Sequence, residues 1–283
     1  MGYVQHWNFK YKPFEEDSNT RFFFESDDHR EALDRMLYVC QDSNMHIGML
    51  TGEVGSGKTI TKTIFENSLP KQRFEVIALE NSHFSFSDIL FDIIYRLSLN
   101  PALNRNKQHS ALPDRNDKYM LVQVFKSYLD TLYYEEKKHL IITLDEAQQI
   151  EENVLDELKN LTNISFEAEN CLTIFFIGQP ELRDKIKKIK PVDQRVFLRF
   201  HLNNLDFSNM VKYVRHRLRV AGLENYSIFT NPALELMFRV TDGIPREINR
   251  LCKLALNYGF VQNCTEITDA DIQIIVDDIR KHS

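Results

Sequence analysis

A glycine-rich stretch near residue 50 constrains the fold of this chain more than any other feature. The sequence Gly52-Glu53-Val54-Gly55-Ser56-Gly57-Lys58-Thr59 follows a short apolar run, and a helix-forming stretch comes after it. Strand, glycine-rich loop and helix in this order point successive backbone N–H groups, and the positive end of the helix dipole, at a phosphate chain. We therefore predict a phosphate-binding loop, or P-loop. An ordinary glycine-rich turn is the alternative.

The residue types in this loop suit a bound nucleoside triphosphate. The glycines let the backbone turn tightly and approach the phosphates closely. Lys58 is predicted to place a positive charge at the β- and γ-phosphates, and the hydroxyl of Thr59 to bind Mg²⁺. The residues predicted to bind ATP are Gly52, Glu53, Val54, Gly55, Ser56, Gly57, Lys58, Thr59 and Ile60.

A second buried strand is predicted at His139–Leu144, and it leads directly into Asp145 and Glu146. Its nearly unbroken apolar run is typical of a parallel strand that is covered on both faces. Open α/β sheets bind ligands at the carboxyl ends of such strands, beside the phosphate loop. We predict that Asp145 holds the Mg²⁺ shell and that Glu146 polarises the attacking water. The alternative is a pair of acids that cap a helix.

Two further strands carry candidate functional residues. The apolar run Cys171–Ile177 ends near Gln179, and a polar side chain at that point can touch both the γ-phosphate and the attacking water. Gln179 is therefore a candidate, with a turn residue as the alternative. A last strand is predicted at Gln194–Leu202, where Arg195 precedes the apolar positions and Arg199 interrupts them.

The length and the apolar periodicity predict one large α/β domain followed by a smaller helical one. A chain of 283 residues can bury a sizeable core, and strands give way to helices after Asp206. We place the boundary so that residues 1–205 form the α/β part and residues 206–283 a helical lid. The predicted helices are Asp28–Cys40, Phe86–Leu99, Tyr119–Tyr134, Val154–Asn163, Ser208–Ala221, Pro232–Val240, Pro245–Tyr258 and Asp269–Lys281.

An aromatic-rich segment precedes the P-loop and needs a surface to cover. Its aromatic residues are Trp7, Phe9, Tyr11, Phe14, Phe22, Phe23 and Phe24. One candidate surface is the adenine face of the nucleotide site, and plain core packing is the alternative.

The composition is that of a soluble globular protein. Hydrophobic residues make up 43% and charged residues 27% of the chain. The net charge of −6 argues against a surface built wholly for DNA, although a local basic strip remains compatible with it. Four scattered cysteines without CxxC spacing indicate neither a zinc site nor a disulfide framework. No apolar run approaches the ~20 residues that span a bilayer, so we expect a cytoplasmic chain without a transmembrane segment.

Several motifs together resemble those of one ATPase family. They are Pro13-Phe14, His29-Arg30-Glu31-Ala32-Leu33, the P-loop, Leu144-Asp145-Glu146-Ala147-Gln148, Gly178-Gln179-Pro180-Glu181-Leu182, Arg215-His216-Arg217-Leu218-Arg219-Val220-Ala221-Gly222 and Gly243-Ile244-Pro245-Arg246. With these residues the chain resembles the AAA+ ATPases of the general secretion pathway protein A type, also called ExeA-like, which include MshM-like pilus biogenesis ATPases. The resemblance covers essentially the whole chain.

The resemblance implies a fold and further site residues. The implied fold is a five-stranded parallel AAA+ core with a C-terminal all-helical lid, and the implied ATP site lies between neighbouring subunits of a ring or helical filament. By similarity, Gln179 is the sensor at the strand end and Arg195 the arginine finger, with Arg199 as its rival. Arg246 resembles the lid arginine that senses the γ-phosphate.

The resemblance also implies a role, an Mg²⁺-dependent ATPase for a type II secretion or type IV (MSHA-like) pilus system. Secretion-type members continue into a membrane span and a periplasmic peptidoglycan-binding part, whereas this sequence stops just after the lid. We therefore expect the chain to reach the inner membrane through a partner.

Two alternatives to that role remain. One is a transposon target-selection ATPase of the TnsC or MuB kind that oligomerises on DNA. The charges that would serve DNA binding are Lys185, Lys187, Lys188, Lys190, Lys212, Arg215 and Arg219. A solvated helix face also explains these charges. The other alternative is a nucleotide-gated scaffold with little turnover, and the intact Lys58, Asp145 and Glu146 argue against it.

Overall fold

The chain forms two compact units, one built on a sheet and one built from helices. The computed structural model describes residues 2–15, 20–41, 45–80, 84–104, 112–223 and 228–281. The sheet unit comprises Glu31–Gly52 and Thr61–His201, and the helical unit comprises Met1–Arg30, Glu53–Ile60 and Leu202–Ser283. The N-terminal segment and most of the P-loop thus pack with the C-terminal helices, whereas the sequence-based division at residue 205 stays a prediction.

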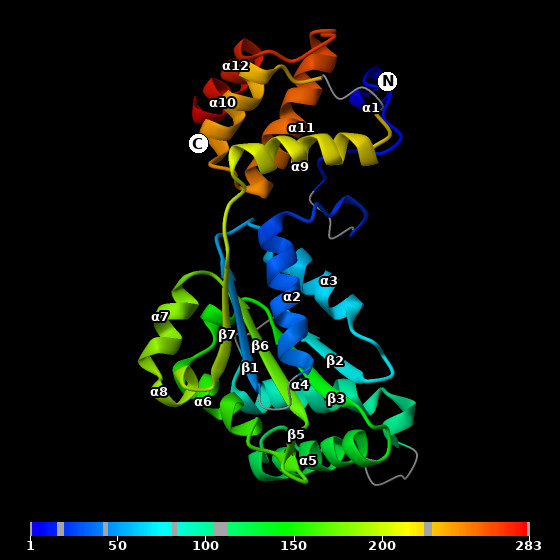
Figure 1. Cartoon of the computed structure of the whole chain (residues 1–283), viewed down its shortest axis with the longest axis vertical. Coiled ribbons are helices and arrows are strands. Elements are labelled where there is room, and N and C mark those ends of the chain that lie inside the picture. The colour runs from blue at the N-terminus through cyan, green and yellow to red at the C-terminus, as the bar shows by residue number, and fades with distance from the viewer. Residues whose placement is uncertain are drawn as a thin grey trace. The chain divides into compact units, whose positions relative to one another are not determined.

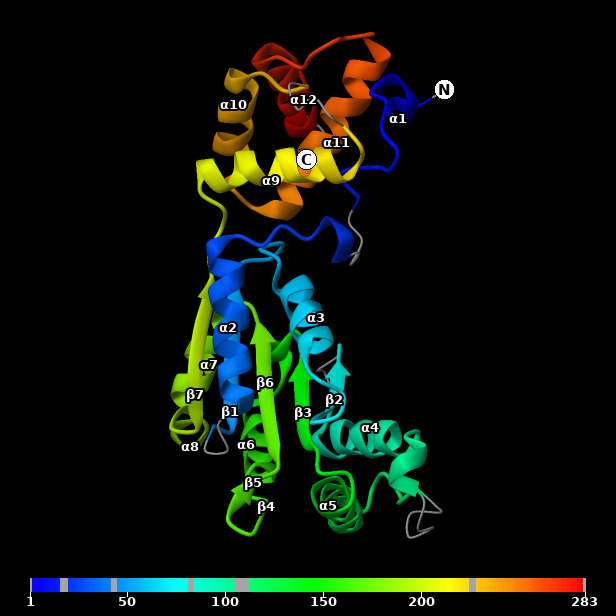
Figure 2. The same cartoon turned by 45° about the vertical axis from the view of Figure 1, so that its right-hand side comes forward.

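A five-stranded parallel sheet forms the centre of the sheet unit (Figures 1 and 2). Its strands are β1 (Ile47–Gly52), β2 (Phe74–Leu79), β3 (His139–Leu144), β6 (Leu172–Gly178) and β7 (Val196–Leu202), in the spatial order β2-β3-β6-β1-β7. Thr51 of β1 pairs with Gly178 at the end of β6, and Leu144 at the end of β3 pairs with Phe176, two residues before that end. The carboxyl ends of these three strands therefore lie along one edge, as the sequence predicted for the strands that carry the P-loop and the two acids.

Helices cover both faces of the sheet (Figure 2). One face shares a buried core with α4 (Phe86–Ser98), α5 (Lys118–Tyr134), α6 (Glu152–Leu161), α7 (Glu181–Lys188) and α8 (Lys190–Asp193). The other face is covered by α2 (Asp27–Gln41) and α3 (Lys58–Ser68). There the ring of Phe65 lies 4.9 Å from the ring of Phe175. Gly48 is required beside it, because a Cβ would lie 2.5 Å from the Phe175 ring.

Several short elements have no counterpart in the prediction. They are α1 (Tyr3–His6), η1 (Thr20–Phe22), η2 (Pro101–Asn104), η3 (Ala147–Gln149), α8, β4 (Ser165–Phe166) and β5 (Glu169–Asn170). Elements of two to four residues are too short to show a period. Pro191 lies in the first turn of α8, where its missing N–H costs nothing. The segment between α4 and α5 contains η2, and its residues 105–111 lie outside the described residues.

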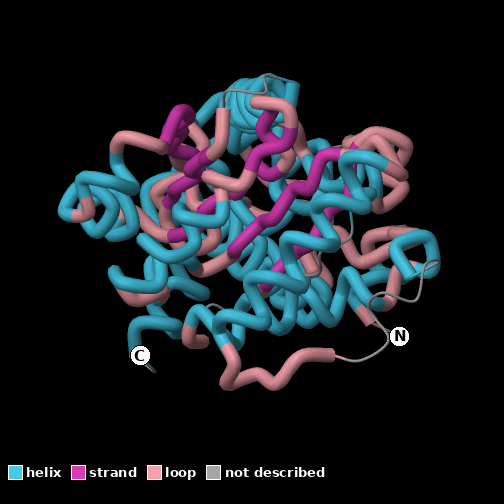
Figure 3. Tube along the Cα trace, turned by 90° about the horizontal axis from the view of Figure 1, so that it is seen from below, coloured by secondary structure: helices cyan, strands magenta, loops and turns pink. Residues whose placement is uncertain are grey.

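The helical unit contains the predicted C-terminal helices (helices cyan and strands magenta in Figure 3). They are α9 (Phe207–Val220), α10 (Asn231–Thr241), α11 (Pro245–Val261) and α12 (Asp269–Lys281). Three of them begin at side-chain caps: the Asp206 carboxylate accepts from the Asn209 N–H at 2.7 Å, the Thr230 hydroxyl from the Ala233 N–H at 3.3 Å, and the Thr268 hydroxyl from the Asp271 N–H at 3.4 Å. Such caps satisfy helix N–H groups that otherwise have no partner.

The aromatic N-terminal segment belongs to the core of this helical unit. The buried aromatic residues are Tyr3, Trp7, Phe9, Phe14 and Phe22. The Trp7 indole N–H donates to the Leu256 carbonyl of α11 at 3.0 Å. Gly259 makes room for the indole, because a Cβ there would lie 2.7 Å from it. These five side chains therefore pack in the core of the helical unit.

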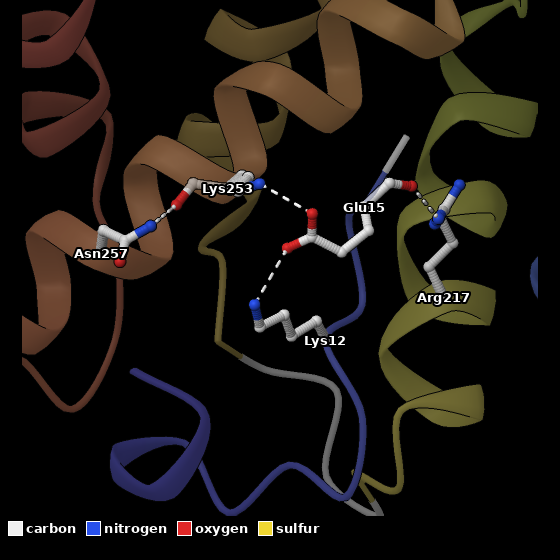
Figure 4. Close-up of polar contacts among 5 residues, drawn as sticks. All are labelled: Lys12, Glu15, Arg217, Lys253 and Asn257. Carbon is white, nitrogen blue, oxygen red and sulfur yellow. Dashed lines mark hydrogen bonds and ion pairs between the residues drawn. The ribbon is translucent and has the colours of Figure 1, made fainter. Parts of the chain in front are cut away.

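A buried arginine fastens the segment to α9 (Figure 4). The guanidinium of Arg217 donates to the carbonyls of Pro13 and Glu15, at 2.6 and 3.0 Å, and to the Tyr213 hydroxyl at 2.8 Å. The Glu15 carboxylate in turn accepts from Lys253 of α11 at 2.8 Å. Arg217, which is 7% exposed, thus holds the segment to α9, and the pair of Glu15 with Lys253 holds it to α11. Burying such a charge is costly unless hydrogen bonds satisfy it, as they do here.

Candidate nucleotide-binding and hydrolysis site

The P-loop has the backbone conformation and the polar groups that a phosphate chain needs. Gly55 and Gly57 have φ values of 82° and 106°, in the region that side chains disfavour. The Lys58 ammonium donates to the Glu53 carbonyl at 2.8 Å, within the loop itself. The Ser56 hydroxyl is buried and has no hydrogen-bond partner in the described part of the chain. A buried hydroxyl without a partner is costly, and a phosphate oxygen would satisfy it.

The P-loop also packs against the start of α11 within the helical unit. The Arg246 N–H donates to the Gly55 carbonyl at 3.3 Å. A Cβ on Gly55 would lie 2.6 Å from the Arg246 Cβ and 3.2 Å from Ile244. Gly243 sets this turn, because its φ of 70° and the nearby Leu205 carbonyl exclude a side chain. The structure therefore places predicted Arg246 directly on the loop.

His29 contacts the loop from the other side and was not predicted as a site residue. Its Nε2 lies 2.8 Å from the position that a Cβ on Gly57 would occupy. The Ser26 hydroxyl lies 2.6 Å from Nδ1 and accepts from the His29 N–H at 3.3 Å. Burial lowers the pKa of His29 to about 4, so its ring is neutral at neutral pH. The only signal for it in the sequence was its place in the His29–Leu33 motif.

The sheet unit carries the two predicted acids directly after β3. Asp145 is 5% exposed, and its Oδ1 accepts from the Glu146 N–H at 2.9 Å. A buried lysine of α3, Lys62, forms an ion pair with Asp145 Oδ2 at 3.8 Å. Burial raises the pKa of Glu66, one turn further along α3, which accepts from the Thr143 hydroxyl. No sequence pattern indicated this polar cluster, because lysine and glutamate on a helix usually face solvent.

The predicted Glu146 and Gln179 meet through a third side chain. Glu146 has a left-handed conformation, with φ 52° and ψ 34°. Its Oε2 accepts from the Gln148 amide at 2.6 Å and from the Gln179 amide at 3.4 Å. The Gln179 N–H donates to Gln148 Oε1 at 3.0 Å. The structure thus brings Glu146 and Gln179 together, and it adds Gln148 between them.

The two rival arginines differ in how their charges are compensated. Arg199 donates to the Asp193 carboxylate at 2.8 Å and to the Asp193 carbonyl at 2.7 Å. Arg195 donates to the neutral amide oxygen of Asn163 at 2.7 Å. Withdrawing Arg199 would break an ion pair, whereas Arg195 would give up a single neutral hydrogen bond. Arg195 precedes β7, so it lies at the amino edge of the sheet, opposite the edge that carries Asp145 and Glu146.

The remaining predicted residues are placed as the loop requires. Thr59 and Ile60 lie in the first turn of α3, and Thr59 is exposed. Val54 is 50% exposed. Among the described residues, no group of three or more His, Cys, Asp and Glu side chains is arranged to bind a metal ion. The assignment of Thr59 and Asp145 to Mg²⁺ therefore stays a prediction.

The parallel sheet, the P-loop after β1 and the acids after β3 define a P-loop nucleoside triphosphatase with a helical C-terminal part. The profile of a family described as "AAA domain" matches residues 41–186. Because this match covers more than half of the chain, the chain belongs to the AAA domain family, and it is an ATPase of the AAA class.

Known proteins extend this similarity over nearly the whole chain. General secretion pathway protein A of Aeromonas hydrophila is 31% identical over 274 residues, which are 96% of this chain and 47% of that protein. This confirms the resemblance found in the sequence, although the chain spans only about half the length of that relative. An uncharacterized HTH-type transcriptional regulator, MJ0774 of Methanocaldococcus jannaschii, is 23% identical over 92% of this chain and 70% of its own length.

The fold is shared with solved AAA structures. The Aeropyrum pernix ORC2 protein, solved as ADPNP–ADP complexes, superposes with a TM-score of 0.68 at 18% identity. The superposition covers 95% of this chain and 72% of that one. At this identity the similarity shows the fold alone. No helix within the described residues is both long and apolar enough to cross a membrane.

The contact between Gly55 and Arg246 leads to a prediction. Gly55→Ala forces a side chain into a left-handed position that costs roughly 1–2 kcal/mol, and it also displaces Arg246. We expect affinity for a fluorescent ATP analogue to fall about tenfold or more, since each 1.4 kcal/mol is a factor of ten. Val54→Ala is the control: it trims an exposed side chain but keeps the backbone N–H group that the loop offers to phosphate, so it should bind as wild type does. Equal binding by both variants would show that the loop tolerates this contact being lost.

Proposed function

We propose that this chain is an Mg²⁺-dependent ATPase that couples ATP hydrolysis to a secretion or pilus machine. Two separate features support the proposal. The P-loop contains the buried Ser56 hydroxyl, which has no hydrogen-bond partner among the described residues, and the Glu146 carboxylate, next to Asp145 in the chain, accepts from two side-chain amides. The 31% identity with general secretion pathway protein A supports the choice of machine.

In the proposed mechanism, the loop binds the phosphates and the acids act on water. Lys58 leaves the Glu53 carbonyl and contacts the β- and γ-phosphates, while Ser56 donates its hydroxyl to a phosphate oxygen. Glu146 polarises the attacking water, and Gln179 orients it. Thr59 and Asp145 would hold Mg²⁺, which would supply positive charge to the phosphates. Arg246 acts on the γ-phosphate from the start of α11.

Arg195 completes the site of a neighbouring subunit in this proposal. β7 has seven residues, and at ~3.3 Å per residue it spans about 20 Å, so Arg195 cannot reach the opposite edge of its own sheet. A charge at that edge can serve a second copy of the chain through a head-to-tail contact. Such contacts close into rings or continue as helical filaments. The weak hold on Arg195, compared with the ion pair of Arg199, supports Arg195 as the arginine finger.

The place of action is proposed from the relatives. We infer that the chain works in the cytoplasm and reaches an inner-membrane component of a type II secretion or MSHA-like pilus system through a partner. Because the chain covers 47% of general secretion pathway protein A, that protein's other parts cannot be carried over.

A DNA-dependent role remains the second candidate, and α9 favours it. Lys212, Arg215 and Arg219 are all exposed at helical spacing on that helix. The other basic strip is partly engaged, because Lys185 donates to backbone carbonyls and Lys187 pairs with Asp184 at 3.6 Å. Only α9 therefore offers an uninterrupted basic face among the residues that were predicted to bind DNA.

Two substitutions separate nucleotide binding from hydrolysis. Lys58→Ala removes the charge that the loop offers the phosphates, so binding of a fluorescent ATP analogue should be lost. Glu146→Gln keeps the shape but not the base, so binding should persist while phosphate release stops. The readouts are analogue titration and steady-state phosphate release. Near wild-type turnover in both variants would refute the ATPase mechanism.

Mixing variants tests whether Arg195 acts across a subunit contact. Arg195→Ala and Glu146→Gln should each be nearly inactive, because an arginine finger contributes ~10³ to 10⁵ in turnover. A mixture should regain activity where an intact Arg195 meets an intact Glu146. Arg199→Ala mixed with Glu146→Gln is the matched control. A mixture no more active than its parts, with assembly confirmed by light scattering, would move the assignment to Arg199.

Binding to duplex DNA distinguishes the two candidate roles. For the secretion or pilus role, binding to random duplex at physiological salt should be no tighter than the non-specific range of ~10⁻⁴ to 10⁻⁶ M and should not depend on ATP. Fluorescence anisotropy measures the affinity, and negative-stain microscopy detects filaments. The DNA-dependent role would be favoured if filaments form on DNA only with ATP. The double variant Arg215→Ala, Arg219→Ala should then form no filaments.

A further inference from the structure

Gln148 makes contacts that together fix its side-chain amide. Its Nε2 donates to Glu146 Oε2 at 2.6 Å, and its Oε1 accepts from the Gln179 N–H at 3.0 Å. A peptide N–H can only donate, so Oε1 must face Gln179 and Nε2 must face Glu146. The orientation of the amide is thus set by chemistry, and it makes Gln148 a bridge between a backbone and a carboxylate.

The main chain beneath this bridge is also held in place. Gln148 lies in η3, the turn that follows the left-handed Glu146. Lys185 of α7 donates to the carbonyl of Gln148 and, at 2.8 Å, to the carbonyl of Ile150. The end of the turn is therefore fixed to α7, and the amide of Gln148 cannot drift with its backbone.

The end of β6 is shaped to receive the same amide. A Cβ on Gly178 would lie 2.5 Å from Gln148 Oε1 and 3.2 Å from the Gln148 nitrogen. Gly178 does not have a positive φ, so space and not backbone conformation requires glycine there. The strand that carries Gln179 and the turn that carries Glu146 therefore fit together through Gln148.

We propose that Gln148 is a positioning residue that couples the end of β6 to the Glu146 carboxylate. This inference rests on the proposed function, in which Glu146 polarises the attacking water. The Gln148 and Gln179 amides both donate to Oε2, and this fixes the plane of the carboxylate and leaves Oε1 to accept from water. A movement of Gln179 is passed to Glu146 through Gln148, whose bond to Glu146 is shorter than the direct 3.4 Å contact.

The coupling can be tested by keeping the volume of Gln148 while removing its hydrogen bonds. Gln148→Met should lower turnover at saturating ATP by about 10²-fold, the effect of misplacing a catalytic group by about 1 Å, and leave the affinity for a fluorescent ATP analogue unchanged. Gln149→Met is the matched control, because Gln149 is the exposed neighbour of the same type. Its turnover should stay within about twofold of wild type, as for an ordinary surface substitution. A purely space-filling role predicts wild-type turnover in Gln148→Met and would overturn the inference.

A double-mutant cycle provides a test that does not depend on one variant. Gly178→Ala should displace the Gln148 amide and lower turnover as Gln148→Met does. Gln148→Ala removes the amide oxygen that the methyl group added at position 178 would meet. In that background, Gly178→Ala should therefore cost much less than it does alone. Additive losses would overturn the inference. Thermal unfolding of every variant confirms that each is folded.

The outcome for Glu146→Gln distinguishes this inference from the proposed function. If Glu146→Gln is inactive while Gln148→Met turns over at the wild-type rate, the inference alone fails. If Glu146→Gln itself turns over at the wild-type rate, Glu146 is not the catalytic base, and both fail together.

Discussion

The lack of a side chain at two P-loop positions is the constraint on which the site depends. Gly55 leaves room for Arg246 and Gly57 leaves room for His29, and both glycines have left-handed φ values. The loop is thus shaped from two sides by the helical unit and continues into the first turn of α3. An arginine and a neutral histidine are held against the loop by packing, so in the proposed function their polar groups are already ordered beside the loop. Preorganised donors of this kind stabilise charge that develops during phosphoryl transfer.

Hydrogen bonds to backbone carbonyls recur at several buried or half-buried cations of this chain. Lys58 donates to Glu53, Arg217 to Pro13 and Glu15, and Lys185 to Ile150. Carbonyl oxygens carry only partial charge, so a cation held in this way keeps most of its attraction for an anion. In the proposed function, Lys58 exchanges the Glu53 carbonyl for phosphate oxygens. In the helical unit the same chemistry is structural, because the N-terminal segment surrounds Arg217.

The sequence alone predicted best the features that depend on residues close together in the chain. The P-loop, the acids after β3 and the long helices follow from local patterns, and the helices and strands lie within a few residues of the predicted bounds. The roles of those residues stay predictions. No local pattern in the sequence indicated the contacts between distant residues. The Gln148 side chain accepts from the Gln179 N–H, 31 positions away, and Lys62 forms an ion pair with Asp145. The pairing of Arg199 with Asp193 likewise depends on how the chain turns into β7, which composition does not encode. The sequence indicated that the N-terminal aromatic residues cover a surface, but it did not indicate which surface.

The N-terminal segment has a consequence for how the protein is made. Trp7 and Phe14 lie in a core whose other members come largely from α9 to α12. A ribosome therefore releases these aromatic side chains before the sheet unit, and most of their packing partners after it. Because domains tend to fold as they emerge, the sheet unit can be complete while apolar rings upstream of it still lack a core. Until α9 to α12 have emerged, those rings are exposed apolar surface of the kind that promotes aggregation. The helices that follow the sheet unit in the chain thus remove from water the aromatic residues that precede it.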